Sequence, residues 1–475
     1  MTETVSMEEL EIQKGFILKI KQFNMNSASE NGHIPLALTE TYGCQQNEND
    51  TERIRGILEE CGFGFTDEPE KADIIIYNTC AVRENAEQKV FGRLGILKHM
   101  KETRRDLIVG LCGCMIQQGH ITETIKEKYP HVNLIFGTHT LHRLPELLWD
   151  VLSKRKRVID IEDSDGYIAE GIPVKRENDS KAWVSVMYGC NNFCTYCIVP
   201  YVRGRERSRK SENILNEIKE LVKSGVTEIT LLGQNVNSYG KDLDENIDFS
   251  DLLRMVNEID GLSRIRFVTS HPKDFSDKLI DTMAECDKVC KQLHLPFQAG
   301  NDRVLKEMNR GYTKAEYLDK IARLKSKIPD IALSTDVIVG FPTETNEDFR
   351  DTIDVLKTVE FDNIFSFIYS RREGTPAAKL DFVLSEDEIH KNFNELLEVQ
   401  NEISLKKNVA FEGKTVEVLV DGTSKTDSRM LSGRMDNTKI VNFPGDPGLE
   451  GKYVKVKITK AHTWSLNGEL TDKLQ

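Results

Sequence analysis

Short apolar runs alternate with stretches of helical periodicity between residues 35 and 158. Runs such as DIIIYNTC and LIVGLCGC have the length of buried strands. Strand and helix in repeated order predict a parallel sheet covered by helices. Residues 1–34 are expected to form an extension with one helix and a polar linker, NMNSASENGH. The helices expected in the sheet domain span residues 50–61, 84–101, 121–128 and 144–153.

A second α/β pattern fills residues 181–408, after an acidic, turn-rich stretch at 159–180 that we expect to be a linker. Six strand-like runs alternate here with helical segments, and a long charged helix at about 385–408 closes the domain. Six such units in a row predict a partial (β/α)6 barrel, with a site formed by loops at the carboxyl ends of the strands. The runs are AWVSVMYG, EITLLGQ, RIRFVTS, KQLHLPFQA, IALSTDVIVG and NIFSFIYS.

The pattern becomes all-β at residues 409–475, where Gly, Pro, Asp and Asn turns separate three long strand-like stretches. Such a pattern predicts a small closed barrel. Two interpretations of its lysines stay open with equal weight: an RNA-binding surface, or the ordinary solvent face of a strand. The lysines are Lys452, Lys455, Lys457 and Lys460.

Composition and net charge argue against some functional classes. The formal charge of −13 over 475 residues argues against a uniform coating of nucleic acid, but not against a local basic site. No apolar run approaches the roughly 18 residues of a membrane span, and no signal peptide is evident, so we expect a cytoplasmic protein with no membrane partner. Nothing in the chain requires more than a monomer. The ten cysteines are expected to be reduced ligands or core residues.

Three cysteines close three apolar runs of the first domain: Cys44, Cys80 and Cys114. Because the carboxyl ends of parallel strands meet at one edge of a sheet, we expect these side chains to emerge together. Cys112 competes with Cys114, since two residues along a strand return to the same face. Cys114 is preferred because it is the last residue of its run and follows a glycine, as Cys44 does.

A second trio, Cys190, Cys194 and Cys197, has the spacing C-x3-C-x2-C directly after the first barrel strand. Zinc sites usually take four protein ligands from two paired knuckles. A four-iron, four-sulfur cluster held by three thiolates keeps one iron free for a small molecule. The spacing, together with its place at a barrel mouth, therefore favours such a cluster.

With Tyr196 before its last cysteine, this motif resembles the signature of radical S-adenosylmethionine enzymes. TYGCQQNENDTERI, NTCAVRENAEQKVFGRLG and GCMIQQ are similar to the N-terminal domain of the methylthiotransferases within that group, and the last region resembles their TRAM domain. The resemblance implies two [4Fe–4S] clusters, with Cys44, Cys80 and Cys114 holding the auxiliary one. It also implies S-adenosylmethionine as the cofactor cleaved to a 5′-deoxyadenosyl radical.

NTCAVRENAEQK and YCIVPYVRGRERSR look most like the branch of the family that modifies tRNA. The implied reaction replaces the C2 hydrogen of N6-isopentenyladenosine, 3′ to the anticodon, by a methylthio group. An electron donor of the flavodoxin or ferredoxin type and a sulfur donor would be needed. Alternatives are a substrate containing threonylcarbamoyl-adenosine, a ribosomal-protein aspartate, or a noncatalytic iron–sulfur protein that binds RNA.

We expect the cofactor site at the carboxyl ends of the barrel strands, capped by the strand-end edge of the first domain. The basic run after the cysteines is expected to meet tRNA phosphate, although such runs are usually just solvated. Each polar candidate also has a purely structural interpretation, in which it satisfies backbone groups. The cofactor candidates are Tyr196, Gln234, Asn235, Ser270, Gln298, Asp336 and Tyr369. The RNA candidates are Arg203, Arg205, Arg207 and Arg209.

Overall fold

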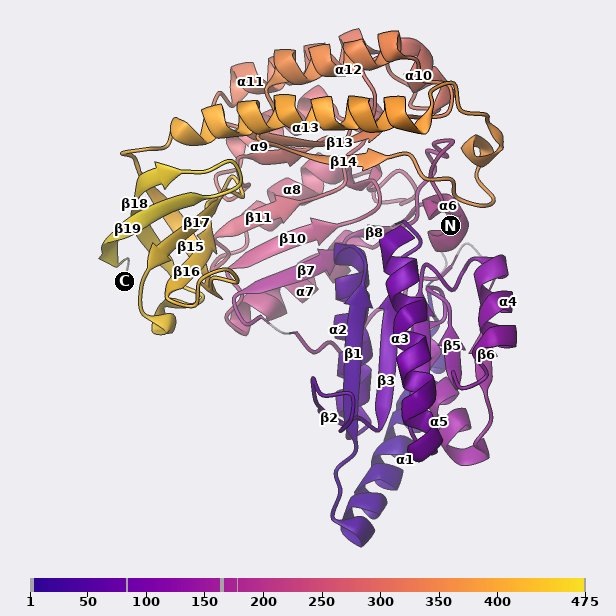
Figure 1. The fold of residues 1–475 in the computed structure, drawn as a ribbon. Coiled ribbons are helices and arrows are strands. Elements are labelled where there is room, and N and C mark those ends of the chain that lie inside the picture. The colour runs from indigo at the N-terminus through magenta and orange to yellow at the C-terminus, as the bar shows by residue number, and fades with distance from the viewer. Residues whose placement is uncertain (1–3, 83, 163–165, 177, 474–475) are drawn as a thin grey trace.

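The computed structural model describes residues 4–82, 84–162, 166–176 and 178–473. Figure 1 shows three units, which are an N-terminal sheet covered by helices, an open barrel and a small closed barrel. Arg83 of the NTCAVREN stretch lies outside the described residues, as do residues 163–165 and 177 of the predicted linker. No helix among the described residues is long and apolar enough to cross a membrane.

The N-terminal sheet is parallel, as predicted, with strand order β2-β1-β3-β4-β5-β6. Its central strands β3 and β4 are buried throughout, because helices cover both faces, and this explains their continuous apolar runs. The strands are β1 (Leu36–Tyr42), β2 (Gly64–Phe65), β3 (Ile74–Thr79), β4 (Ile108–Gly113), β5 (Leu134–Phe136) and β6 (Val158–Asp160). The helices are α2 (Gln45–Glu60), α3 (Glu84–Thr103), α4 (Gly119–Lys128) and α5 (Leu144–Lys154).

Helix α2 starts earlier than the pattern predicts, at Gln45 and not at residue 50. Its first turn contains polar residues that are nevertheless buried, among them Gln46, Asn47 and Asn49. Apolar periodicity could not mark this turn, because its buried side chains hydrogen-bond instead of packing as hydrocarbon.

The prediction of a polar linker before the sheet is wrong. Helix α1 (Met7–Asn31) runs through that stretch and ends at Gly32, whose φ of 68° is the left-handed conformation that glycine adopts without steric cost. Ile17 and Ile20 on α1 are buried in the core between the sheet and α5. The helix is therefore part of the packed domain.

The stretch predicted as a linker is also more ordered than its composition suggests. It begins within strand β6, and its described residues contact both the sheet domain and the barrel. The backbone N–H of Val5 donates to Ile168 O, and that of Lys175 donates to Glu52 O, each at 2.9 Å.

The central unit is the predicted partial barrel, made of two three-stranded parallel sheets, β7-β10-β11 and β12-β13-β14. An isolated bridge between Ile265 and Val289 connects them, and β14 does not pair with β7 in the part of the chain that the structure describes. The six strands are β7 (Lys181–Ser185), β10 (Glu228–Leu232), β11 (Arg264–Phe267), β12 (Gln292–His294), β13 (Ala332–Val339) and β14 (Asn363–Ile368). The outer helices are α7 (Ser211–Lys223), α8 (Phe249–Asn257), α9 (Asp277–Glu285), α10 (Asp302–Glu307), α11 (Lys314–Lys327), α12 (Asn346–Val359) and α13 (Glu386–Val409).

The C-terminal unit is a closed five-stranded barrel of order β15-β16-β17-β19-β18, as the turn pattern predicts. It sits against the end of the open barrel where the parallel strands begin (Figure 1). Arg264 and Arg266 at that end are buried, and they donate to Glu417 and to the carbonyl of Asp436. The strands are β15 (Thr415–Thr423), β16 (Met430–Arg434), β17 (Ile440–Pro444), β18 (Tyr453–Ala461) and β19 (Leu466–Lys473).

Candidate active site

Three cysteines of the N-terminal domain come from the carboxyl ends of adjacent strands. Cys44 follows β1 and caps α2, Cys80 follows β3 directly, and Cys114 follows β4. Gly113 makes the last turn possible, because its φ is 96° and a Cβ there would lie 2.4 Å from Thr79 O. Cys44 and Cys80 lie near enough to Cys114 to raise the pKa of its thiol.

Cys112 and Cys114 occupy different environments. Cys112 lies within β4, with its thiol 3.8 Å from Tyr77 O, and packs in the hydrophobic core of the sheet domain. Cys114 packs with Ile198 and Val202, which follow the second cysteine trio. The geometry therefore favours Cys114 as the third candidate ligand of the first trio. Cys61, Cys286 and Cys290 are buried core residues, as their helical context predicts.

The second trio lies in a loop between β8 (Met187–Tyr188) and the short helix α6 (Val199–Arg203). Gly189 opens the loop with φ 74°, and a Cβ there would lie 1.9 Å from Arg205 O. Phe193 takes a left-handed φ of 45°, which is strained for a residue with a side chain. Such strain is often found at functional sites.

A buried arginine that the sequence analysis missed contacts this second trio. Arg310 Nη1 lies 3.3 Å from both Cys194 Sγ and the Tyr196 hydroxyl, and Nη2 donates to Pro296 O at 2.7 Å. Its position in a turn between α10 and α11, more than a hundred residues from Cys194, left no signal in the local pattern.

Burial and charge set the state of the thiols. Burial raises the pKa of Cys114 and of Cys197 to about 12 each, while Arg203 and Arg310 oppose the shift. A ligating cysteine must lose its proton, so these arginine charges favour metal binding. No three His, Cys, Asp or Glu side chains among the described residues converge as the ligands of one ion would. Three thiolates are the donor set of a four-iron cluster in which one iron has no protein ligand.

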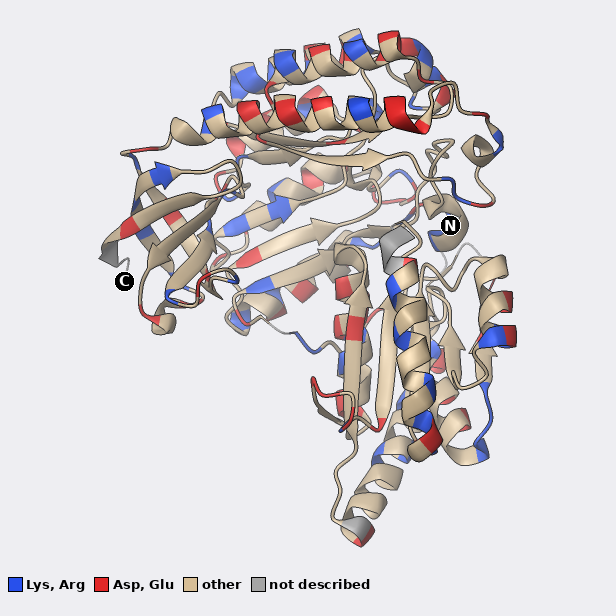
Figure 2. Cartoon of the chain, viewed as in Figure 1, with Lys and Arg blue, Asp and Glu red and all other residues tan. Residues whose placement is uncertain are grey.

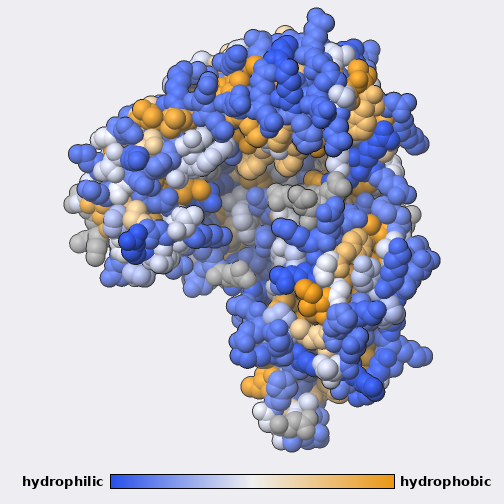
Figure 3. All heavy atoms as spheres, in the orientation of Figure 1, coloured by the Kyte–Doolittle hydropathy of each residue, from blue (hydrophilic) through white to orange (hydrophobic). Residues whose placement is uncertain are grey.

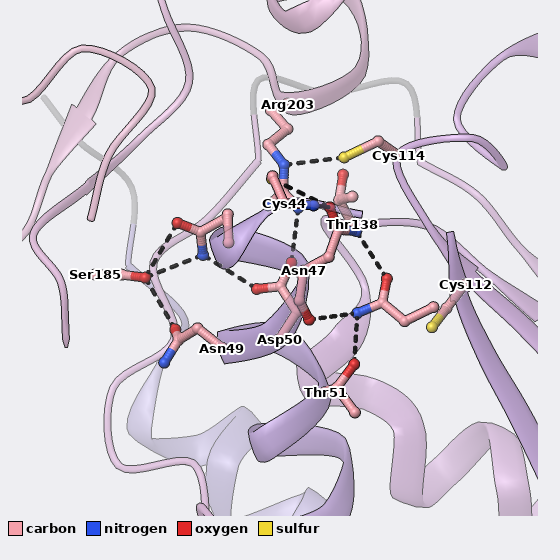
Figure 4. A network of polar contacts seen from close by, with 12 residues as sticks. Cys44, Asn47, Asn49, Asp50, Thr51, Cys112, Cys114, Thr138, Ser185 and Arg203 are labelled. Carbon is pink, nitrogen blue, oxygen red and sulfur yellow. Dashed lines mark hydrogen bonds and ion pairs between the residues drawn. The ribbon is translucent and has the colours of Figure 1, made fainter. Parts of the chain in front are cut away.

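A buried polar network joins the two domains beside the first trio (Figure 4). Gln46 Nε2 donates to Ser185 Oγ on barrel strand β7 at 3.0 Å, and that hydroxyl donates to Asn49 Oδ1 at 2.9 Å. Asn47 Nδ2 donates to Asn78 Oδ1 at 3.0 Å. The QQNEND stretch therefore fixes the strand-end edge of the sheet domain against the barrel, as the expected capping arrangement requires.

The arginines after the second trio are not a solvated basic surface. Arg207 and Arg209 are buried, as is Arg203, which lies against Cys114. Arg209 is held by Glu170 at 2.6 Å and by Glu217 at 2.8 Å, and Arg207 donates to the carbonyl of Arg205 at 2.8 Å. Contact of these three arginines with RNA phosphate stays a prediction, which their burial does not support. Arg205 is exposed, with its guanidinium 4.4 Å from the centre of the Phe193 ring.

Several predicted cofactor residues carry buried polar atoms with no hydrogen-bond partner within the described ranges. They include Asn235 Oδ1, Ser270 Oγ and the Tyr369 hydroxyl, together with His271 Nε2. All follow barrel strands at their carboxyl ends. Because burying an unpaired polar atom costs free energy, such a group of atoms indicates a place for a polar ligand. The residues present therefore fit S-adenosylmethionine.

The other predicted cofactor residues have identified contacts. Gln234 accepts a hydrogen bond from the backbone N–H of Gly189, so it supports the cysteine loop. Gln298 is buried and has a left-handed φ of 71°. Asp336 Oδ1 lies 3.5 Å from His294 Nε2. Ligand contacts of these residues stay predictions.

The outer helices offer no continuous basic surface, since Lys and Arg alternate with Asp and Glu along α11, α12 and α13 (Figure 2). The space-filling view shows a hollow between the C-terminal barrel, the outer helices and the N-terminal domain (Figure 3). On β14, Phe365 and Phe367 are exposed. Ile364, on the opposite face of the strand, is buried in the core. Because side chains alternate along a strand, the two phenylalanines share the face opposite to Ile364.

Three family profiles match the chain in succession. The Uncharacterized protein family UPF0004 matches residues 37–137, the Radical SAM superfamily residues 184–356 and the TRAM domain residues 409–471. A tRNA-2-methylthio-N(6)-dimethylallyladenosine synthase from Acetivibrio thermocellus is 54% identical, over 98% of this chain and 97% of its own. This chain belongs to the tRNA-2-methylthio-N(6)-dimethylallyladenosine synthase family. Proteins of the same name from Clostridium botulinum strain Loch Maree and Clostridioides difficile are 56% and 51% identical, over 90% and 99% of this chain and 96% and 98% of their own.

Solved structures of a more distant enzyme share the fold over much of the chain. The radical S-adenosylmethionine methyltransferase TsrM from Kitasatospora setae, with a cofactor analogue bound, has a TM-score of 0.51 at 16% identity, over 72% of this chain and 75% of its own. The same enzyme with cobalamin and a [4Fe-4S] cluster has a TM-score of 0.52 at 15% identity, over 72% of this chain and 77% of its own. At these identities the likeness concerns the fold alone.

Proposed function

We propose that the chain replaces the C2 hydrogen of N6-isopentenyladenosine, 3′ to the anticodon of tRNA, by a methylthio group. One observation carries the proposal: two cysteine trios meet at one interface, where α6 after the second trio packs on Cys114 of the first. Relatives of more than 50% identity bear the name of this activity. Cys190, Cys194 and Cys197 would hold one [4Fe–4S] cluster, and Cys44, Cys80 and Cys114 the other. When bound, the first cluster supplies the electron that cleaves S-adenosylmethionine.

The residues of this chain would orient the cofactor and keep water out. We propose that Asn235, Ser270 and Tyr369 bind the polar groups of S-adenosylmethionine, since each has a buried polar atom without a partner in the described structure. Tyr196 is held by Arg310, which also contacts Cys194, so the ring is fixed beside the second trio. Gln298 and Asp336 line the same strand ends from β12 and β13.

The hollow in Figure 3 is the proposed entry for the anticodon loop. Reaching an adenine in this loop requires unstacking it, which costs a few kcal/mol and is cheapest in single-stranded RNA. The exposed rings of Phe365 and Phe367 offer an aromatic surface on which an unstacked base and its apolar substituent can pack. The exposed lysines of β18 are proposed to contact the tRNA phosphates.

The reaction also defines its partners. Reductive cleavage needs an electron, so we propose a donor of the flavodoxin or ferredoxin type, and each product needs one sulfur atom from a sulfur donor. Both candidate cysteine trios come from a single chain, which supports activity as a monomer. The tRNA substrate supports a cytoplasmic location. The domain limits at residues 35, 159, 181 and 409 are likewise proposed.

Arg205 and Arg209 should respond differently to replacement. Arg205→Gln is expected to weaken tRNA binding and to lower the slope of log affinity against log salt by about 1, because one exposed phosphate contact is lost. Filter binding over a salt series measures this effect. Equal salt slopes for wild type and Arg205→Gln would exclude the phosphate contact.

Arg209→Met is expected to lower the free energy of unfolding by about 3–5 kcal/mol, because Glu170 and Glu217 lose their buried partner. Denaturant titration measures this effect.

The proposed activity is tested on tRNA from cells that lack the modification. Anaerobically reconstituted protein is incubated with this tRNA, reductant and S-adenosylmethionine, and the nucleosides are then analysed by mass spectrometry. We expect the methylthio derivative of isopentenyladenosine. A methylthio group on threonylcarbamoyl-adenosine, or unchanged tRNA with modified ribosomal protein, would replace the proposal by one of the alternatives.

A further inference from the structure

Arg203 ends the helix that follows the second cysteine trio, and its side chain contacts Cys114 of the first trio. Its Nε donates to Cys114 Sγ at 3.0 Å, and its Nη2 donates to Asp50 Oδ2 at 2.8 Å. Arg203 is only 6% exposed, and both of its partners come from the N-terminal domain. Figure 4 shows the side chain reaching from the barrel towards Cys114, above the polar network of α2.

The position of Arg203 follows from the shape of the loop that precedes it. Helix α6 begins two residues after Cys197 and ends at Arg203. Ile198 and Val202 on this helix pack against Ala81 and Cys114, which belong to the strand-end edge of the other domain. A five-residue helix therefore has one cysteine trio at its start and the other trio at its end.

The charges around Arg203 indicate what it does there. Asp50 neutralises one end of the guanidinium, which explains why a cation is stable in this buried place. The Nε–H points to a sulfur, and Arg203 also lies close enough to Cys44 for their charges to interact. Hydrogen bonds and positive charge near a ligating sulfur stabilise the reduced form of an iron–sulfur cluster and raise its reduction potential.

We propose that Arg203 is a positioning residue of the auxiliary site: it orients the sulfur of Cys114 and raises the reduction potential of the cluster bound there. The inference rests on the proposed second cluster. It means that the loop which binds the first cluster also sets the electron affinity of the second. A change in the loop that carries Cys190, Cys194 and Cys197 would thus alter both proposed metal sites.

Arg310 provides a matched comparison. It is as buried as Arg203 and also donates to a cysteine sulfur, but to Cys194 of the other trio. Its remaining contacts, with Tyr196, Pro296 and Tyr312, all lie in the barrel domain. In a protein that already lacks the Cys194 sulfur, replacing Arg310 therefore removes a buried arginine of the barrel domain without touching the auxiliary site.

The test uses the full chain with Cys190, Cys194 and Cys197 replaced by alanine, so that only the auxiliary cluster remains. Into this background we place Arg203→Gln, Arg203→Lys, Arg310→Gln and the exposed control Arg205→Gln. After anaerobic reconstitution, iron per chain is counted, and the reduced fraction is followed by electron paramagnetic resonance during a redox titration.

We expect Arg203→Gln to lower the ratio of reduced to oxidised cluster at a fixed potential at least tenfold, which is about 59 mV for one electron. Arg203→Lys keeps the charge, so its ratio of reduced to oxidised cluster should lie between those of Arg203→Gln and the background protein. The ratios of Arg310→Gln and Arg205→Gln should equal that of the background protein. An unchanged potential in Arg203→Gln would overturn the inference. If Arg203→Gln loses its iron, restoration of iron and potential by Arg203→Lys supports the positioning role, and failure of this rescue overturns it. A background protein without any iron would instead refute the proposed second cluster.

Discussion

Replacing Cys190, Cys194 and Cys197 together by alanine is expected to reduce cleavage of S-adenosylmethionine to an undetectable level. The three thiols lie in one loop after β8, and the unpaired polar atoms of Asn235 and Ser270 follow the carboxyl ends of β10 and β11. Without these ligands no cluster can pass an electron to the cofactor, and side chains have no one-electron chemistry to replace it. Formation of 5′-deoxyadenosine under anaerobic conditions with reductant measures the effect.

The control for this variant removes three other cysteines. Cys61 and Cys286 are buried in hydrophobic cores and Cys290 is buried beside Arg266, so their joint replacement by alanine should leave cleavage intact. Circular dichroism checks that both triple variants are folded. Persistent cleavage in the variant that lacks the C-x3-C-x2-C cysteines would refute the radical assignment.

The second large effect concerns the N-terminal trio. Replacing Cys44, Cys80 and Cys114 by alanine should preserve cofactor cleavage but stop formation of the methylthio nucleoside. Iron content should fall from about eight to about four per chain, because one four-iron cluster is lost. The barrel loop with the other three ligands keeps its own supports, Gln234 and Arg310, so the radical site should survive. Nucleoside mass spectrometry and iron analysis of one preparation measure both quantities.

Cys112→Ala is the matched control, since it removes a thiol two residues from Cys114. Its side chain lies in the sheet core, so product formation and iron content should remain near those of the wild type. Iron loss in Cys112→Ala, with normal iron in Cys114→Ala, would reverse the assignment. A product-forming variant without Cys44, Cys80 and Cys114 would show that sulfur insertion occurs elsewhere.

The apolar runs predicted the parallel sheet correctly, because parallel strands that are buried on both faces consist of long apolar runs. The topology alone placed Cys44, Cys80 and Cys114 at one sheet edge, since strand direction determines where each run ends. The same reasoning missed the first turn of α2. There Gln46 and Asn49 are buried by contact with Ser185 of another domain, and no local period can reveal such a contact.

The arginine run shows a different limit of sequence reasoning. Whether a cation is solvated or paired depends on carboxylates that can lie far away in the chain. Glu170 and Asp50 are 39 and 153 residues from Arg209 and Arg203, respectively. Their pairing became visible only when the domains were seen packed together, whereas the cysteine spacing was a local signal and could be interpreted directly.

The contact of Arg203 with Asp50 and Cys114 has a consequence for dissecting the protein. A fragment that ends before the barrel would contain all three cysteines of the first trio, but Asp50 would lose its buried counter-ion and Gln46 its hydroxyl partner. A gene fragment can end at residue 180, yet Arg203 and Ser185 of the barrel domain contact residues around the first trio. We therefore expect the N-terminal module alone to lack part of the polar environment of its three cysteines, which the pair of domains together supplies.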